Sequence, residues 1–552
     1  MKAFASLLDR LTLTPQRNGK IRLMVDYVAS VPDPERGYGI AAITRDLSIA
    51  SVKPAMLRAL MAERMDEVLL GYSYDYVGDL AETISLVWPE RGDGEHQPTL
   101  TEVVETLQRA TRLDGPRLVE GWLDHLDASG RYALLKLVTG ELRIGVTARL
   151  AKQALAQFGG KDVTEIEEIW HGLAPPYTEL FAWLEGRTDK PVSAARGPFR
   201  PVMLSQALDE EADLPKIQPA DYAAEWKWDG IRVQATSDQG VRRLYSRTGD
   251  DISGAFPDIL ELLDYEGSID GELLVAREDQ GSIAIAPFGD LQQRLNRKVI
   301  SPKLIKSHPA FIRAYDLLQD GEEDLRALPF ADRRKRLEAF VARLASPRID
   351  ISPLVPFDDP DHLAALRANP PTDARIHEVA EGLMLKRWDS AYVPGRPKGP
   401  WFKWKRDPFV VDAVLMYAQR GHGRRSSFYS DYTFGVWTGP EAAPELVPVG
   451  KAYFGFTDEE LRELDRYIRN NTVDRFGPVR SVRAEPDHGL VLEIAFEGLN
   501  RSVRHRSGIA MRFPRVSRLR WDKPPSEADR LENLERMLPR DASPKKVRKA
   551  SA

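Results

Sequence analysis

The chain has 552 residues, too many for one hydrophobic core, so its length predicts roughly two to four domains, and about three is the expected number. Hydrophobic residues make up 42% and charged residues 29%, which is typical of globular proteins and argues against disordered and membrane classes. There is no cysteine, which excludes disulfides, a thiol nucleophile and thiolate metal sites. The net charge of −5 leaves a nucleic-acid partner open, because basic and acidic surfaces can be segregated.

The first part of the chain, up to about Glu185, has apolar residues at helical spacing, and Thr147 is placed to cap one of the helices. We therefore predict an all-helical domain over residues 1–188. Asp9 and Arg10 interrupt the N-terminus before a signal-peptide core could form. No apolar run approaches the roughly 20 residues that span a bilayer. We expect a cytoplasmic protein with no membrane partner, associated with the nucleoid if its source is bacterial.

A change in sequence pattern follows the segment Lys190–Val202, which is rich in proline, glycine and basic residues without periodicity and reads as a linker. Short β-like runs such as Glu225–Ala235 then alternate with helical segments such as Asp332–Leu344. This alternation predicts an α+β domain over residues 202–406.

The pattern changes again after Lys405, where alternating strands surround one helical insert at Asp458–Arg469. This pattern predicts a small β-barrel over residues 407–530. The last segment, residues 531–552, ends in a basic run and is predicted to be a frayed tail rather than a dedicated DNA contact.

The most informative segment is Glu225–Arg232, with the sequence EWKWDGIR. It places Lys227 on a strand pattern just before a glycine turn, between acidic and basic groups. A lysine amine can attack an α-phosphate, and nearby cations or a dry pocket can lower its pKa enough for the neutral form to be present. The KxDG pattern alone is weak evidence, because an exposed strand end with an i,i+2 Lys–Asp pair would have the same sequence.

Further segments follow in the order that covalent nucleotidyl transfer needs. They are Lys227, Arg232, Ser246 and Arg247, Asp270–Glu272, Tyr315 and Asp316, Glu381 and Gly382, Lys403 and Lys405, and Arg518–Lys523. Together they resemble the motif set of the covalent nucleotidyltransferases, and they are most similar to the larger cellular ATP-dependent DNA ligases. Taken singly, each element has a structural alternative, such as a surface carboxylate or a core aromatic. The ordered joint occurrence favours the enzyme.

The resemblance implies that Lys227 carries AMP and that a nucleotide site surrounds it. Glu225 is expected to help read the adenine edge, and Tyr315 to stack on the adenine face in place of the phenylalanine usual in the family. Arg232 and Arg247 are expected to contact phosphates and ribose, because their rigid forks suit such groups.

The same resemblance assigns carboxylates and lysines to the phosphates and the metal. Glu272 is expected to bind the ribose and also metal, and Glu381 is the best candidate ligand for Mg²⁺, which phosphoryl transfer from a polyphosphate requires. Lys403 and Lys405 point to the same side of their strand, so both ammonium groups can face one phosphate-filled cleft. Arg396 resembles a phosphate-contacting arginine of the family, although its spacing to Lys403 departs slightly from the family pattern.

The C-terminal motif residues Arg518, Asp522 and Lys523 lie far along the chain from the other motifs. The resemblance implies an OB-fold for the barrel that carries them, and a clamp on the β- and γ-phosphates of ATP in the first step only. Such a clamp must swing away before DNA enters, and a hinge near Arg406–Pro408 is a hypothesis that rests on the change of domain there.

The helical domain resembles the DNA-binding domain of the larger ligases, as seen in Leu134–Leu155 and Arg17–Arg22. Gly140 and Gly145 bracket Arg143, so that backbone amides and a guanidinium can approach DNA phosphates without reading sequence. An ordinary turn in a helix hairpin is the alternative for these residues.

The resemblance as a whole implies an ATP-dependent DNA ligase that seals 3′-OH/5′-phosphate nicks in duplex DNA through lysyl-AMP and adenylylated DNA. It would use ATP and Mg²⁺, act as a monomer, and serve DNA replication, repair or recombination. An RNA ligase or a capping-type nucleotidyltransferase shares the lysine motif and is the alternative, but neither has a helical duplex-gripping domain ahead of it. NAD-dependent ligases carry a four-cysteine zinc element, which this cysteine-free chain cannot form.

Overall fold

The structure of the protein is a computed structural model. The structure describes residues 1–64, 66, 79–89, 97–140, 142–192, 195–279, 282–295, 297, 300–371, 376–420, 429–453, 457–502 and 505–538. The chain divides into two compact units, of which the first covers Met1–Pro198 and the second begins at Phe199. None of the helices in the described ranges is long and apolar enough to cross a membrane. The basic tail beyond residue 538 lies outside the described residues.

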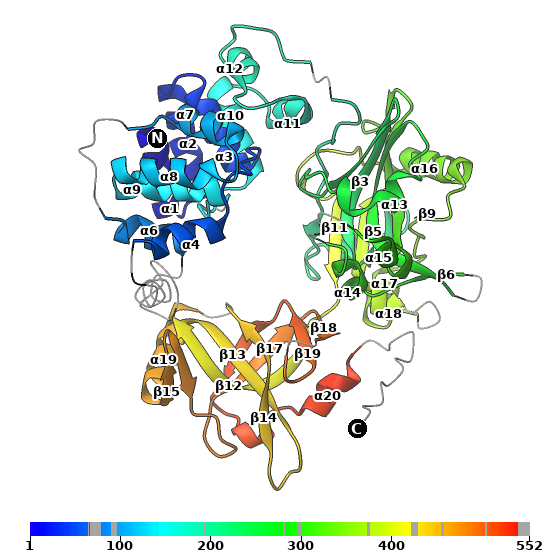
Figure 1. Ribbon diagram of the computed structural model, residues 1–552. Coiled ribbons are helices and arrows are strands. Elements are labelled where there is room, and N and C mark those ends of the chain that lie inside the picture. The colour runs from blue at the N-terminus through cyan, green and yellow to red at the C-terminus, as the bar shows by residue number, and fades with distance from the viewer. Residues whose placement is uncertain are drawn as a thin grey trace. The chain divides into compact units, whose positions relative to one another are not determined.

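The first unit is helical throughout its described part (Figure 1). Its α-helices are α1 (Lys2–Leu13), α2 (Arg17–Ser30), α3 (Glu35–Thr44), α4 (Pro54–Ala62), α6 (Leu80–Val87), α7 (Leu100–Arg109), α8 (Asp114–His125), α9 (Ala128–Thr139), α10 (Ala148–Gly159), α11 (Val163–Ile169) and α12 (Thr178–Leu184). The hydroxyl of Thr147 accepts a hydrogen bond from the backbone N–H of Leu150 at 3.2 Å and so caps α10, as predicted. One continuous apolar core joins these helices.

The second unit begins with a two-sheet region, residues 199–405. A four-stranded sheet has the order β1 (Gln206–Ala207), β11 (Trp401–Lys405), β10 (Ala380–Arg387) and β2 (Tyr222–Trp228). A larger sheet has the order β4 (Val241–Ser246), β3 (Ile231–Asp238), β5 (Gly267–Asp279), β7 (Ala310–Asp320) and β8 (Glu323–Asp324), with β6 (Ser282–Ile285) and β9 (Ile349–Ile351) attached to β5 and β7. This is the α+β pattern that the sequence predicts.

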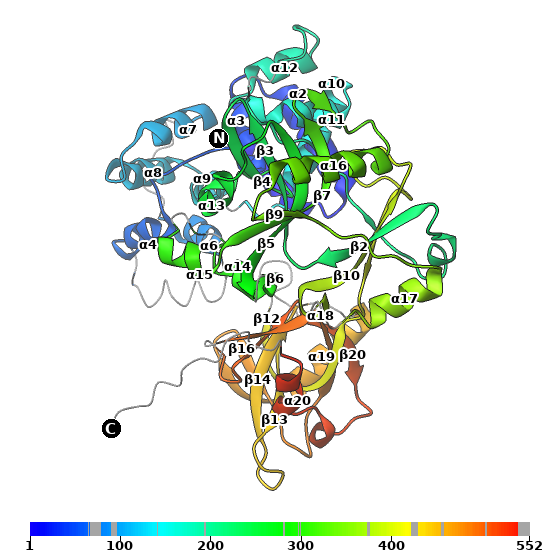
Figure 2. The same cartoon turned by 90° about the vertical axis from the view of Figure 1, so that its right-hand side faces the viewer.

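Helices complete the two-sheet region. They are α13 (Pro257–Leu260), α14 (Phe288–Gln292), α15 (Pro302–Ser307), α16 (Phe330–Leu344), α17 (Pro360–Ala368) and α18 (Ile376–Val379). The longest of them, α16, packs against β7 (Figure 2). It adds Leu337 and Phe340 to the core of the larger sheet. Helices therefore support one face of the sheet and leave the other face available for a site.

The C-terminal β-domain, Phe409–Leu538 in its described part, is built around the long strand β12 (Phe409–Arg420), which pairs with β13 (Tyr429–Thr438), β16 (Val479–Val482) and β17 (Val491–Phe496). The remaining elements are β14 (Glu445–Ala452), β15 (Thr472–Phe476), β18 (Gly498–Arg501), β19 (Ile509–Arg512), β20 (Arg515–Arg520), and the helices α19 (Asp458–Asn470) and α20 (Leu531–Arg536). Strands on both sides of α19, the helical insert predicted at Asp458–Arg469, agree with the pattern that the sequence predicts for this region.

Candidate active site

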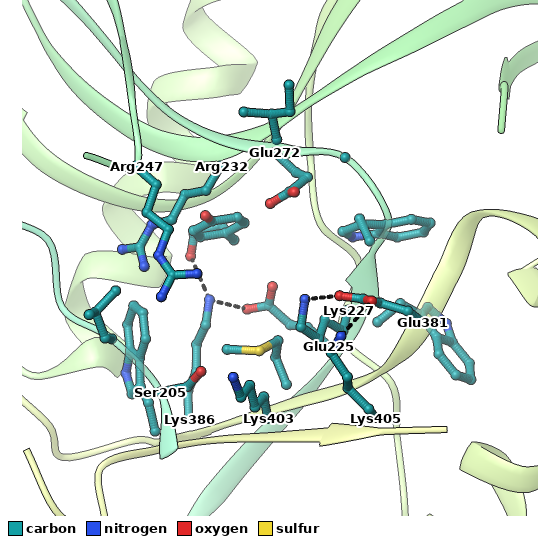
Figure 3. A pocket seen from close by; sticks show the side chains of 18 residues that line it. Ser205, Glu225, Lys227, Arg232, Arg247, Glu272, Glu381, Lys386, Lys403 and Lys405 are labelled. Carbon is teal, nitrogen blue, oxygen red and sulfur yellow. Dashed lines mark hydrogen bonds and ion pairs between the residues drawn. The ribbon is translucent and has the colours of Figure 1, made fainter. Parts of the chain in front are cut away.

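A cavity of about 410 Å³ lies between the two sheets of the two-sheet region (Figure 3). Strands β2, β10 and β11 of the smaller sheet supply one part of its lining, and β3, β5 and β7 of the larger sheet supply another. Nine of the predicted site residues line it: Glu225, Lys227, Arg232, Arg247, Glu272, Tyr315, Glu381, Lys403 and Lys405. Residues that are 180 positions apart in the sequence thus share one cavity.

The candidate nucleophile, Lys227, is the penultimate residue of β2, and the chain turns into β3 directly after it. The turn contains Gly230, where an added Cβ would lie 2.5 Å from the carbonyl oxygen of Leu273. Only glycine permits this close approach. The turn therefore fixes the position of Lys227 at the end of β2, and its ammonium group points into the cavity.

A carboxylate, Glu381, lies between two ammonium groups. It accepts a hydrogen bond from Nζ of Lys227, and its other oxygen lies 3.1 Å from Nζ of Lys405. Burial alone would raise the pKa of Glu381, but Lys227 and then Lys405 outweigh this effect and hold that pKa below its usual value. Glu381 is therefore ionised at neutral pH, and it holds the amine of Lys227 in place.

A register shift in β10 brings a further lysine into the cavity. The pairing of β10 with β2 shifts between Ala380 and Leu383, and Gly382 at the shift has φ +144°. An added Cβ on Gly382 would lie 2.2 Å from the carbonyl oxygen of Trp404. Because the shift changes the alternation of the strand, both Glu381 and Lys386 reach the cavity, although they are an odd number of residues apart.

Lys386 was not predicted as a site residue, yet it is central to the inner end of the cavity. Its Nζ donates to Oε1 of Glu225 at 3.0 Å and to the carbonyl oxygen of Tyr315 at 3.2 Å. The same ammonium lies 4.6 Å from the centre of the Tyr315 ring and 4.9 Å from the Trp401 ring. Glu225 and Lys386 are almost fully buried, at 2% and 1% exposed. The pair therefore orients the carboxylate and the aromatic face together.

Arg232 also lines the cavity, but most of its donors are already engaged. Its Nε and Nη2 donate to Asp270 at 3.0 and 2.6 Å, Nη2 also donates to the hydroxyl of Tyr392, and Nη1 donates to the carbonyl oxygen of Met203 at 2.6 Å. The guanidinium is thus held in one orientation by a fully buried carboxylate. Such a restrained cation contributes charge to the cavity and has little freedom to move toward a ligand.

The basic residues of the cavity mouth repel one another. Burial and then the nearby cations Lys227, Arg396 and Lys405 lower the pKa of Lys403. Burial, followed by Arg232 and Arg396, lowers the pKa of Arg247. Arg396 itself is exposed and does not line the cavity, although its charge acts on residues that do. An anion bound at this mouth would relieve the repulsion.

Glu272 faces the cavity from β5. Burial raises its pKa to about 8, and the neighbouring carboxylate of Glu381 acts in the same direction, while Lys227 and Arg232 oppose the shift. A carboxylate with a raised pKa gains from any added cation or hydrogen-bond donor. In the part of the chain that the structure describes, no group of three or more His, Asp or Glu residues is placed to hold a metal ion. A metal here would therefore need ligand atoms beyond the side chains of Glu272 and Glu381.

The C-terminal motif residues do not line this cavity. Arg518 lies on β20 within 3.4 Å of Glu493, Lys523 donates to Asp412 at 2.7 Å, and the neighbouring Asp522 accepts from Arg520 at 2.8 Å. Their partners all belong to the C-terminal β-domain itself.

A different face of the C-terminal β-domain contacts the residues around the cavity. Arg512 of β19 forms a two-pronged ion pair with Asp229, just after Lys227, and Nζ of Lys405 donates to Glu497 at 3.0 Å. The face with Arg512 and Glu497, rather than the face with Lys523, therefore adjoins the cavity in this structure.

Arg143, the residue predicted to contact DNA, lies in the first unit between α9 and α10. It is exposed and has φ +49°, and Gly145 has φ +62°. The buried Lys20 of α2 donates to the carbonyl oxygens of Ile144 at 2.5 Å and Gly145 at 3.2 Å, and these hydrogen bonds hold the backbone of the turn in place. The turn therefore presents Arg143 outward from a rigid base.

These features define a class of protein. A helical N-terminal region, a two-sheet region with a lysine beside a carboxylate in its cavity, and an OB-like β-domain are the parts of a nucleotidyltransferase-type ligase fold. A solved structure with the name "Pmar-Lig_PreS3" is similar in fold, with a TM-score of 0.58 at 15% identity over 94% of this chain and 99% of that chain. This likeness concerns the fold alone.

Sequence comparison identifies the family. The model of the ATP dependent DNA ligase domain matches residues 202–405, and that of the ATP dependent DNA ligase C terminal region matches residues 425–523. A relative from Koribacter versatilis, named "Probable DNA ligase", is 31% identical over 97% of this chain and 96% of its own length. "DNA ligase 1" of Korarchaeum cryptofilum is 28% identical over 100% of this chain and 99% of its own. The chain belongs to the family of ATP-dependent DNA ligases.

Proposed function

We propose that Lys227 is the nucleophile with which this ligase seals nicks in duplex DNA. In the first step, Nζ of Lys227 gives a proton to solvent and bonds to the α-phosphorus of ATP, while the bond from that phosphorus to the bridging oxygen breaks and pyrophosphate leaves. AMP then passes to the 5′-phosphate of the nick, and the 3′-hydroxyl finally displaces AMP. The observation that carries this proposal is the ion pair of Lys227 with Glu381 inside the cavity. Each step is a displacement at phosphorus, for which positioning and charge neutralisation supply most of the rate.

The inner end of the cavity suits adenine. We assign the adenine face to Tyr315, because an aromatic ring binds a base with little loss of entropy. Burial raises the pKa of the Tyr315 phenol well above its usual value, so the hydroxyl stays neutral. Glu225, held by Lys386 at 3.0 Å, is the acceptor for the adenine edge. The purine would therefore lie against the strand end that precedes Lys227.

The outer end of the cavity suits phosphates. We assign Lys403, Lys405 and Arg247 to the phosphates and ribose, with Arg232 as a fixed positive charge and Arg396 at the margin. Glu272 and Glu381 are the residues that would hold Mg²⁺, and the raised pKa of Glu272 fits a carboxylate that gains a cation on binding. Mg²⁺ is usually bound through one or two carboxylates together with substrate phosphates, and it supplies charge neutralisation there.

The C-terminal motif serves the first step in this proposal. Arg518, Asp522 and Lys523 would clamp the β- and γ-phosphates of ATP after the C-terminal β-domain turns, with the hinge at Arg406–Pro408. The contact of Arg512 with Asp229 belongs to the other orientation, in which the clamp is away from the cavity. The two orientations would separate AMP transfer to lysine from the steps on DNA.

The remaining assignments concern DNA and domain limits. We propose that residues 1–188 form a DNA-binding domain whose residue Arg143 contacts phosphates, that residues 202–406 form the adenylation domain, and that residues 407–530 form the OB-fold domain. Residues 531–538, predicted as the start of the tail, instead pack on the C-terminal β-domain through α20 and bury Leu534 in its core, so the tail would be residues 539–552. A monomer suffices, because one chain supplies every residue used above.

Incubation with ATP labelled at the α-phosphate, followed by a denaturing gel and peptide mass spectrometry, tests the nucleophile. Lys227→Ala should take up no label and seal no nicks, while its nick binding stays within about tenfold, or about 1.4 kcal/mol, of the unaltered chain. The exposed Lys216→Ala is the matched control and should label normally. Label on another residue of the Lys227→Ala variant, or an adduct formed from GTP rather than ATP, would overturn the assignment.

A further inference from the structure

The basic residues of the C-terminal motif rest on a row of acidic side chains. Asp412 of β12 lies directly opposite Glu493 of β17, and Glu493 lies directly opposite Arg518 of β20. Residues that are directly opposite in neighbouring strands point to the same face of the sheet. Two acids therefore lie beside Arg518 on the face from which Arg520 and Lys523 also reach toward Asp412.

The contacts of Asp412 are specific to this motif. Its Oδ2 accepts from Nζ of Lys523 at 2.7 Å and from Nη1 of Arg520 at 3.3 Å. The Asp412 side chain is only 13% exposed. Its other oxygen, Oδ1, is buried and has no hydrogen-bond partner among the residues that the structure describes. The charge of Asp412 is thus compensated mainly by these two cations, and not by the strand around it.

The carboxylate is not needed to hold β12 in place. The backbone N–H of Asp412 donates to Oδ2 of Asp529 at 2.9 Å, and its carbonyl oxygen accepts from the N–H of Asp529 at 2.8 Å. The pairing with β17 runs on through both neighbours, Val411 and Ala413. Burying an acid with one unsatisfied oxygen costs free energy, so the carboxylate is better explained by what it does to the basic residues.

We propose that Asp412 is a positioning residue for the first step of the reaction, because it holds Lys523 and Arg520 as a preformed pair of cations that meets the β- and γ-phosphates of ATP. This proposal rests on the clamp function proposed above. A free lysine or arginine side chain loses rotamer entropy when it is fixed, and neighbouring cations repel each other. The carboxylate removes part of both costs before ATP arrives.

The position of Asp412 favours this role over the alternative, in which Asp412 would bind the cations of the motif only while they are away from the cavity. Asp412, Glu493 and the motif residues all lie on strands of the same C-terminal β-domain or directly after one. A rotation of that domain would carry the acids and the cations together. The contacts therefore need not break when the clamp reaches the cavity, and they can hold the cations in place as they bind.

Asp412→Asn tests the proposal, because it keeps the shape of the side chain and removes its charge. Two reactions are compared in the full chain: formation of lysyl-AMP as a function of ATP concentration, and single-turnover sealing of nicked DNA that already carries AMP. We expect kcat/KM for lysyl-AMP formation to fall about tenfold or more, with sealing within about twofold. Glu445→Gln, which breaks the ion pair of Glu445 with Arg506 on the same domain, is the control and should change neither rate.

Three results would overturn the positioning role: an unchanged rate of lysyl-AMP formation, an increased rate, or equal losses in both reactions. Lys523→Ala separates this inference from the clamp function. If Lys523→Ala slows lysyl-AMP formation selectively and Asp412→Asn does not, only the inference on Asp412 fails. If Lys523→Ala has no selective effect, the clamp function fails.

The double variant Asp412→Asn/Lys523→Ala gives an independent check. Because Asp412 acts through Lys523 and Arg520, the loss of lysyl-AMP formation in the double variant should be clearly smaller than the product of the two single losses. Losses that multiply would show that Asp412 acts by another route. If Asp412→Asn does not fold, Glu493→Gln removes the second acid under the motif and should produce the same selective loss, and a rate equal to that of the unaltered chain would refute the proposal.

Discussion

Replacing Lys386 with methionine tests how much the buried ion pair of Lys386 with Glu225 contributes to the stability of the site. The variant leaves the carboxylate of Glu225, which is 2% exposed, and within the described part of the chain its one remaining ion-pair partner is Arg334 at 3.8 Å. Removing one partner of a buried ion pair typically costs about 3–5 kcal/mol. Arg334 and the packing of the methionine chain against Tyr315 and Trp401 offset part of this cost, so we expect a loss of about 2–4 kcal/mol in the local stability of the site.

Hydrogen exchange of the full chain measures this loss at the strands concerned. Where exchange follows the opening equilibrium, the amides of β2 and β10 in Lys386→Met should exchange about 30- to 700-fold faster, since about 1.4 kcal/mol corresponds to a factor of ten. The double variant Glu225→Gln/Lys386→Met removes both charges and should recover at least half of the protection. Unchanged exchange in the single variant, or additive losses in the double variant, would refute the reasoning. The rate of lysyl-AMP formation should fall in both variants. The single variant loses Lys386, which positions Glu225, and the double variant also loses the carboxylate of Glu225 that would accept from the adenine edge.

Three further variants test the structure elsewhere. Gly382→Ala places a Cβ 2.2 Å from the carbonyl oxygen of Trp404, so we expect a cost of about 2–4 kcal/mol, read as faster amide exchange in β10 and β11; normal exchange would contradict the close packing. Burial alone would raise the pKa of Asp79, but the hydrogen bond from the buried Lys136 outweighs this effect, so the pKa of Asp79 in the folded protein is lowered. Asp79→Asn should therefore cost about 3 kcal/mol above pH 4, and this difference should vanish as the pH falls through the lowered pKa; urea unfolding over a pH series checks it, and a pH-independent difference would count against the ion pair. Glu381→Gln should slow lysyl-AMP formation by at least about 100-fold and weaken its dependence on Mg²⁺, and a normal response to Mg²⁺ titration would remove Glu381 as a ligand.

The elements of this fold are predictable because their signals are local. Thr147 caps α10, and the segment Asp332–Leu344 lies within α16, as periodicity and capping preferences indicate. The helical insert predicted at Asp458–Arg469 is α19, which begins and ends within one residue of the prediction. Hydrophobic spacing and turn residues determine these elements, so tertiary structure is not required to find them.

The inner end of the cavity was less accessible to sequence reasoning. Strict alternation from Glu381 would direct Lys386 to the other face of β10, and only the register shift at Gly382 returns it to the cavity. A similar shift in the pairing of β5 with β7 lies at Tyr315, which has no directly opposite partner between Ala314 and Asp316. Bulges redirect side chains, and a single sequence carries little signal for them beyond a glycine within the strand.

The sequence predicts that the guanidinium of Arg232 contacts phosphates and ribose. The structure shows its guanidinium bound to Asp270, Tyr392 and the backbone of Met203, which are distant in the sequence. Such contacts arise only when the two sheets pack together, so motif spacing cannot reveal them. The residue type at a motif position was therefore easier to foresee than the number of donors that a ligand can use.

The charge of the cavity explains how a chain with a net charge of −5 can attract a polyphosphate. Its lining carries six basic side chains and three acidic ones, so the cavity is positive although the whole chain is negative. Two of the three acids, Glu225 and Glu381, are already paired with Lys386 and Lys227. The unpaired positive charge is concentrated at the mouth, where repulsion from neighbouring cations helps to lower the pKa of Lys403. Binding of an anionic nucleotide relieves this repulsion, and release of pyrophosphate restores part of it, so the same electrostatic arrangement can favour entry of ATP and then entry of a DNA phosphate.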